Sequence, residues 1–138
     1  MIILDTNVIS EVMRPEPNGS VIAWLDALAS ATLFLTSTTV SGLLFGIESI
    51  HSGKRKNRLH LYAKGLQEIF AERILPFDLL AAQHHAELAV AARKRGQGFP
   101  VPDGYIAAIA ASRGFAIATR DTVPFASVGL EVIDPWNA

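Results

Sequence analysis

The chain has 138 residues, of which 50% are hydrophobic and 18% are charged, so it suits one globular domain and is not a disordered chain. It contains no cysteine, which excludes disulfides, thiolate zinc sites and a cysteine nucleophile, and which suits a reducing, cytoplasmic location. The net charge of −1 does not by itself indicate a nucleic-acid-binding protein, and no segment has the pattern of a signal peptide or a membrane span.

Short apolar runs alternate along the chain with segments of helical periodicity. We expect strands at Met1–Leu4, Thr32–Thr36, Ile74–Phe77, Phe115–Thr119 and Glu131–Ile133. We expect helices at Thr6–Met13, Ser20–Ala29, Ser37–Ile50, Lys54–Glu72, Leu79–Arg95 and Asp103–Ser112. Pro76 favours an edge position for the third strand, because proline cannot donate a ladder hydrogen bond. The alternation predicts a single α/β domain over residues 1–138, with a parallel β-sheet flanked by helices on both faces.

Three aspartates stand at the ends of these expected elements. Asp5 directly follows the first strand, Asp121 lies just beyond the fourth, and Asp103 begins the helix that precedes the fourth strand. Each has an ordinary structural explanation when taken alone, Asp5 and Asp103 as helix N-caps and Asp121 as a turn residue. Together they are more informative, because parallel sheets of this class bind ligands at the carboxyl ends of their strands.

Three carboxylates brought together repel one another and raise each other's pKa values unless a cation is present. A hard divalent ion with oxygen ligands, Mg²⁺ or Mn²⁺, relieves that repulsion. Such an ion lowers the pKa of bound water and polarises a phosphoryl oxygen, which is the chemistry of phosphodiester hydrolysis. The hypothesis depends on the convergence of the three side chains, which spacing alone does not establish.

Five segments in order along the chain resemble those of PIN-domain ribonucleases of the VapC/FitB type, the toxins of bacterial type II toxin–antitoxin pairs. The segments are MIILDTNVISEVM, TTVSGLLFGIE, PVPDGYIAAIAAS, FAIATRD and VIDPW. The resemblance implies a PIN-like three-layer α/β/α fold and Mg²⁺- or Mn²⁺-dependent endoribonuclease activity on RNA. It further implies a VapB-type antitoxin as partner, DNA contact only through that antitoxin, and a homodimer.

The resemblance also implies roles for individual residues. Asp5, Asp103 and Asp121 match three of the family's acidic positions and are the expected catalytic and metal-binding residues. Asn7 and Thr119 match polar residues that support the site in such proteins.

Gly42 stands where the family normally carries a further acidic residue, a glutamate. The departure is explained either by an inactivating substitution or by three aspartates that suffice for weakened metal binding. Compensation by Glu48 or Glu11 is less favoured, because Glu48 lies six residues, about 600° of helical rotation, beyond Gly42 and Glu11 lies equally far beyond Asp5. We therefore expect the chain to be impaired relative to its Gly42→Glu counterpart.

The sequence leaves two rival functions open. A non-catalytic PIN-like module would bind antitoxin or RNA without turnover. The glycine at position 42, in place of the expected glutamate, is compatible with this function. A phosphoacceptor receiver-like domain would also place acids at strand ends, but it needs an aspartate after the third strand, where Asp78 fits loosely.

Two basic clusters and several aromatic residues have ordinary explanations. The run 54–58 and the cluster 93–95 are solvated helix ends or phosphate-contacting patches, and the first explanation is favoured. The adjacent His84 and His85 point about 100° apart and are ordinary helix residues. Trp24 and Trp136 are expected to pack rather than to stack on bases.

Overall fold

A single parallel sheet forms the centre of the molecule in the computed structural model, which describes all residues 1–138. Its strands are β1 (Ile2–Leu4), β2 (Leu33–Thr36), β3 (Ile74–Leu75), β4 (Ala116–Ala118) and β5 (Val132–Ile133). They lie in the order β3-β2-β1-β4-β5, and every neighbouring pair is parallel. The strand that carries Pro76 beyond its end, β3, is an edge strand, as predicted.

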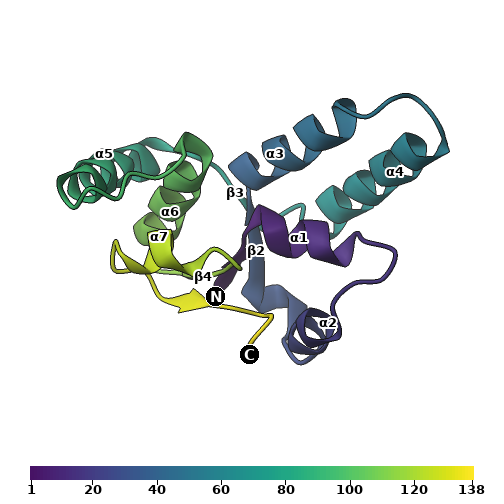
Figure 1. Cartoon of the computed structure of the whole chain (residues 1–138), viewed down its shortest axis with the longest axis horizontal. Helices are drawn as coiled ribbons and strands as arrows, with labels where there is room; N and C mark the ends of the chain where they lie inside the picture. Colours follow the sequence, from purple (N-terminus) through teal and green to yellow (C-terminus); the bar gives the residue numbers. More distant parts are fainter.

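Helices cover both faces of the sheet (Figure 1). The helices of one face are α1 (Thr6–Val12), α2 (Gly19–Asp26), α3 (Ser37–Glu48) and α4 (Lys54–Ile69). The helices of the other face are α5 (Leu79–Lys94), α6 (Val101–Arg113) and α7 (Thr122–Ala126). The predicted fold class, a parallel sheet between two helical layers, is confirmed.

Strand β1 shows how the sheet separates two cores. Successive side chains of a strand point to opposite faces. Leu4 accordingly packs in the cluster with Val8 of α1, whereas Ile3 packs in the cluster with Ile106 and Phe125 of α6 and α7. Because both faces are buried, β1 reads as a continuous apolar run, which is typical of parallel sheets.

The structure differs from the predicted elements at a few boundaries. Helix α6 begins at Val101, so Asp103 lies within its first turn and is not the N-cap. Pro102 is compatible with this earlier start, because the first helical turn does not use its N–H groups for internal bonds. The short helix α7 and a 3₁₀ turn at Ser30–Thr32 were not predicted, and Thr119 lies one residue past β4.

The central pair of strands brings two sequence-distant chain segments to one edge. Leu4 of β1 pairs with Ala118 of β4, and the N–H of Asp5 donates to the carbonyl oxygen of Ala118 at 2.9 Å. The residues that follow both strands therefore emerge side by side. None of the helices has the length and apolar character needed to cross a membrane.

Candidate active site

A cleft of about 520 Å³ opens where β1 and β4 end. Four of the five residues singled out in the sequence line it: Asp5, Asn7, Asp103 and Asp121. The fifth, Thr119, is fully buried, and its hydroxyl forms hydrogen bonds with Asp5 and Asn7 of the cleft wall. The fold thus brings together side chains from β1, α1, α6 and the turn after β4.

Asp5 is held in place on both of its carboxylate oxygens. Oδ1 accepts from the N–H of Thr6 at 2.7 Å, as expected of a residue that precedes a helix, and Oδ2 accepts from the Thr119 hydroxyl at 2.8 Å. The side chain is only 5% exposed. Burial raises the pKa of Asp5, the two hydrogen bonds oppose that rise, and the charge of Asp121 adds to it.

Thr119 connects the groups around Asp5. Its hydroxyl donates to Asp5 and accepts from Asn7 Nδ2 at 3.1 Å and from the N–H of Asp121 at 3.1 Å. Asn7 in turn accepts from the N–H of Arg120 at 3.3 Å through Oδ1. One buried hydroxyl therefore fixes the position of Asp5, the orientation of Asn7 and the start of the turn that carries Asp121.

Asp103 is repelled by the charges of both other aspartates. Its pKa is raised to about 6, first by burial and then by the charges of Asp5 and Asp121. Asp103 is half-buried, whereas Asp121 is exposed at the rim. The three carboxylates therefore lie close enough to repel one another, which is the electrostatic condition under which a cation is favourable.

The residues fit a hard divalent ion by their chemistry. No group of three histidine, cysteine or acidic side chains stands in an arrangement that could hold a metal ion. Mg²⁺, however, is usually held by one or two carboxylates and keeps several waters, which an open cleft can admit. The oxygen donors of Asp5, Asp103 and Asp121 fit such a partly hydrated ion, as do the burial and the charge repulsion that raise the pKa of Asp103.

Glu11, which the sequence did not favour as a replacement for the missing acid, lines the same cleft. Its carboxylate accepts from the N–H of Asn18 at 3.0 Å and pairs with Arg14 at 3.3 Å. The pKa of Glu11 is lowered, chiefly by the hydrogen bond from Asn18. These contacts occupy the carboxylate, so Glu11 organises the cleft wall. Glu11 follows Asn7 by four residues, and this spacing is the sequence signal that indicates a common helical face.

The rim of the cleft holds two residues that the sequence did not assign to it, Arg120 and Trp136. The Arg120 guanidinium lies 5.1 Å from the centroid of the Trp136 ring, a cation–π arrangement. Trp136 also packs against the core, as expected. Local sequence offered no signal for this pair, because it forms only when the C-terminal segment folds back to the turn after β4.

Gly42 of α3 faces α1 beside the cleft. A Cβ atom at this position would lie 4.0 Å from the Thr6 side chain, which is ordinary van der Waals contact. The backbone therefore has room for a larger side chain that points toward Thr6. Glu48 points elsewhere: its carboxylate contacts His60 at 2.9 Å and Lys56 at 4.0 Å on α4.

The remaining candidates have structural roles away from the cleft. Asp78 caps α5 by accepting from the N–H of Ala81 at 2.9 Å, so it supplies no second acid for a receiver-like site. The His85 ring packs against Phe77 and Tyr105. Trp24 packs against the core.

Comparison with known proteins agrees with this fold. Residues 2–130 match the PIN domain. The chain is 45% identical over 138 residues to VapC ribonuclease Y4jK of Sinorhizobium fredii, and 43% identical to toxin FitB of Neisseria gonorrhoeae, with 99% of both chains covered in each case. The crystal structure of FitAcB from Neisseria gonorrhoeae contains a chain that is similar at a TM-score of 0.95 and 42% identity, with 100% of both chains covered.

The parallel sheet and the family match over residues 2–130 define the class of protein. The chain belongs to the PIN-domain family, in the branch that contains VapC ribonucleases and the toxin FitB. The resemblance inferred from the five sequence segments is thereby confirmed.

Proposed function

We propose that this protein is a metal-dependent endoribonuclease that acts as the toxin of a type II toxin–antitoxin pair. The observation that carries the proposal is that Asp5, Asp103 and Asp121 line one cleft, in which burial and the charges of the other two aspartates raise the pKa of Asp103. Family membership supports the same reaction, because the relatives include a VapC ribonuclease.

In this proposal Asp5, Asp103 and Asp121 would hold Mg²⁺ or Mn²⁺, and the ion would supply Lewis-acid chemistry for hydrolysis of a phosphodiester. Thr119 and the N–H of Thr6 keep the Asp5 carboxylate in one orientation. Asn7, fixed by Thr119 and by the N–H of Arg120, supports the site as a polar neighbour. Such outer contacts matter because they orient the metal ligands.

The proposed partners follow from the family. We propose a VapB-type antitoxin as the inhibitor, contact with DNA only through that antitoxin, a homodimer as the working form and the cytoplasm as the location. Support comes from the kinship with VapC ribonuclease and toxin FitB. The absence of cysteine suits a reducing compartment.

A second function is favoured by one observation, the glycine at position 42. Without the family's glutamate, the protein could retain the fold and bind antitoxin or RNA without turnover. The difference between the two functions lies in catalysis alone, so a cleavage measurement separates them.

The test is cleavage of a labelled single-stranded RNA with Mg²⁺, with Mn²⁺ and with EDTA. We expect metal-dependent cleavage by the unmodified chain and its loss in Asp5→Asn. The control is Asp26→Asn, an exposed aspartate of α2 that does not line the cleft and should leave cleavage unchanged. A folded protein that cleaves no RNA with either ion would instead support the non-catalytic function.

A further inference from the structure

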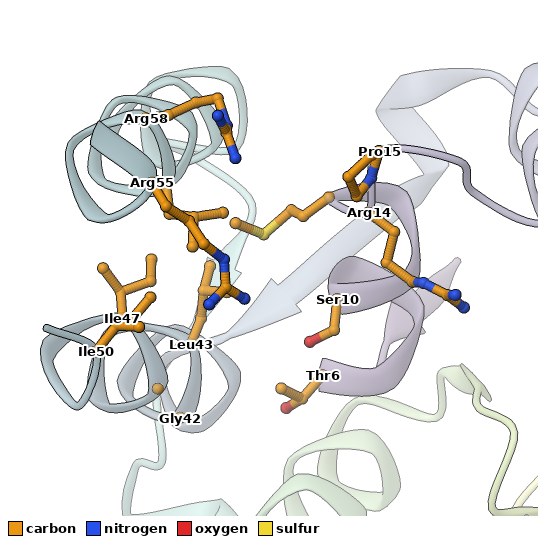
Figure 2. A pocket seen from close by; sticks show the side chains of 13 residues that line it. Thr6, Ser10, Arg14, Pro15, Gly42, Leu43, Ile47, Ile50, Arg55 and Arg58 are labelled. Atoms are coloured by element: carbon orange, nitrogen blue, oxygen red, sulfur yellow. The ribbon is translucent and has the colours of Figure 1, made fainter. Parts of the chain in front are cut away.

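A second hollow adjoins the acidic cleft. It is a groove of about 310 Å³ between α1, α3 and α4 (Figure 2). Thr6, Ser10 and Arg14 line both the groove and the cleft, so the two meet along one face of α1. The two hollows are therefore neighbours, and residues of α1 belong to the lining of both.

Two arginines of α4 supply the charge of this groove. Arg55 reaches into the space between α3 and α1, and Arg58 lies one turn further along α4 (Figure 2). Neither forms an ion pair or a side-chain hydrogen bond within the protein. In contrast, Arg14 pairs with Glu11 and Arg73 donates to main-chain carbonyl oxygens.

Opposite the polar side chains of α1, part of the groove lining is apolar or lacks side chains. Leu43, Ile47 and Leu59 provide an apolar surface under the arginines. Gly42 and Gly46, one turn apart on α3, leave the wall open, and a Cβ atom on Gly46 would have no neighbour within 4 Å. Unpaired guanidinium groups beside an apolar surface suit a ligand that combines an anion with the face of a flat aromatic ring.

We propose that this groove binds a nucleotide of single-stranded RNA beside the bond that is cleaved. Arg55 and Arg58 hold its phosphate, and the apolar surface receives its base. Arginine suits this role because its planar fork donates two parallel hydrogen bonds to a phosphate. The inference rests on the proposed ribonuclease function and adds substrate-positioning residues to it. The run 54–58 then acts partly as a phosphate contact, and not only as a solvated helix start.

The experiment measures binding of a fluorescein-labelled single-stranded RNA by fluorescence anisotropy in EDTA, over a range of salt concentrations. The variant is Arg55→Gln with Arg58→Gln, and the matched control is Arg93→Gln with Lys94→Gln at the distant end of α5. We expect the first pair to weaken binding about tenfold and to reduce the salt slope by about 0.7 for each phosphate that the protein no longer neutralises. The control removes the same charge and should change neither.

A second variant closes the groove without touching an arginine. Gly46→Gln places a side chain in the open wall, whereas Gly65→Gln, on α4 and also free of neighbours within 4 Å, does not line the groove. Both changes should raise helix stability by similar amounts, because glycine is a poor helix former. Only Gly46→Gln should weaken RNA binding and raise KM for cleavage.

Two results would overturn the groove assignment. One is equal RNA affinity and salt slope in the Arg55/Arg58 and Arg93/Lys94 variants, and the other is equal affinity in the two glycine variants. If the unmodified chain cleaves RNA in either case, the ribonuclease function stands and the groove serves another molecule, such as a protein partner. If the unmodified chain neither cleaves nor binds RNA, the proposed function itself fails.

Discussion

At the scale of single residues, the electrostatic cost of the cleft centres on Asp103. The burial of its carboxyl group and the charges of Asp5 and Asp121 raise its pKa to about 6. In an unfolded chain the carboxyl group would ionise near its ordinary value of 3.8. Above about pH 6 the charged carboxylate of Asp103 therefore lowers the free energy of unfolding of the metal-free protein. This loss of stability disappears when Asp103 is protonated.

The raised pKa makes a prediction about stability in EDTA. As pH rises from about 4 through about 6, the contribution of Asp103 to the free energy of unfolding should fall. Asp103→Asn removes the charge, so this variant should unfold at higher urea concentration than the unmodified chain at pH 7. Near pH 4 the two should unfold at similar concentrations. A constant difference across this range would contradict the electrostatic explanation.

Gly42 carries the second prediction at this scale. Gly42→Glu restores the acidic residue of the family, and the site has room for its Cβ atom beside Thr6. We expect metal affinity or cleavage rate to rise about 10–100-fold, as is typical when a partner of a metal site is regained. Titration calorimetry with Mn²⁺ and initial cleavage rates measure the change. If the Gly42→Glu protein cleaves RNA no faster than the unmodified chain, the chain is not impaired at this position.

At the scale of elements, one hydroxyl ties β1, α1 and the turn after β4 together. Thr119 makes three side-chain hydrogen bonds, to Asp5, Asn7 and the N–H of Asp121, while fully buried. The N–H of Thr6 holds one carboxylate oxygen of Asp5, and Thr119 holds the other. The strand pair therefore positions Asp5, and these two hydrogen bonds orient its carboxylate.

Replacement of this hydroxyl provides the prediction at the element scale. Thr119→Val keeps the shape of the side chain but leaves Asp5 Oδ2 and Asn7 Nδ2 without the hydroxyl that they contact. We expect the free energy of unfolding to fall by about 1–3 kcal/mol, together with a loss of metal-dependent cleavage. The control, Thr38→Val, changes a threonine on α3 that makes no side-chain hydrogen bond and should leave both unchanged. Urea unfolding and cleavage assays give the two readouts.

At the scale of the whole molecule, the cleft joins chain segments that are otherwise independent. Asp5 follows β1, Asp103 lies in the first turn of α6, and Asp121 precedes α7. These positions meet only in the folded sheet, so the ion of the proposed function would bind the native state and not the unfolded chain. Under that proposal, metal binding is linked to the stability of the entire fold.

This linkage predicts that Mn²⁺ stabilises the protein. At a free Mn²⁺ concentration of 100 times Kd, the free energy of unfolding should rise by roughly 2.7 kcal/mol, and EDTA should reverse the rise. Asp5→Asn should lose most of the effect, whereas Asp26→Asn should keep it, because Asp26 does not line the cleft. Equal stabilisation of both variants, measured by thermal unfolding, would place the ion elsewhere.

Much of the fold could be predicted because its signals are local. The apolar run that forms β1, the helical periodicity of α5 and the edge position indicated by Pro76 each depend on neighbouring residues. The start of α6 was misplaced by two residues, because an aspartate after a loop resembles an N-cap. The helix in fact begins earlier, with Pro102 in its first turn.

The sequence by itself determined the class of fold and the acidic residues at strand ends, because hydrophobic periodicity and residue chemistry are local properties. Only the tertiary structure decided which groups meet. Thr119 donates to Asp5 across a separation of 114 residues, and Glu11, Arg120 and Trp136 join the cleft. The groove that brings Arg55 beside α1 is of the same kind. Such contacts depend on strand order and helix packing, which act over distances along the chain that no local pattern encodes.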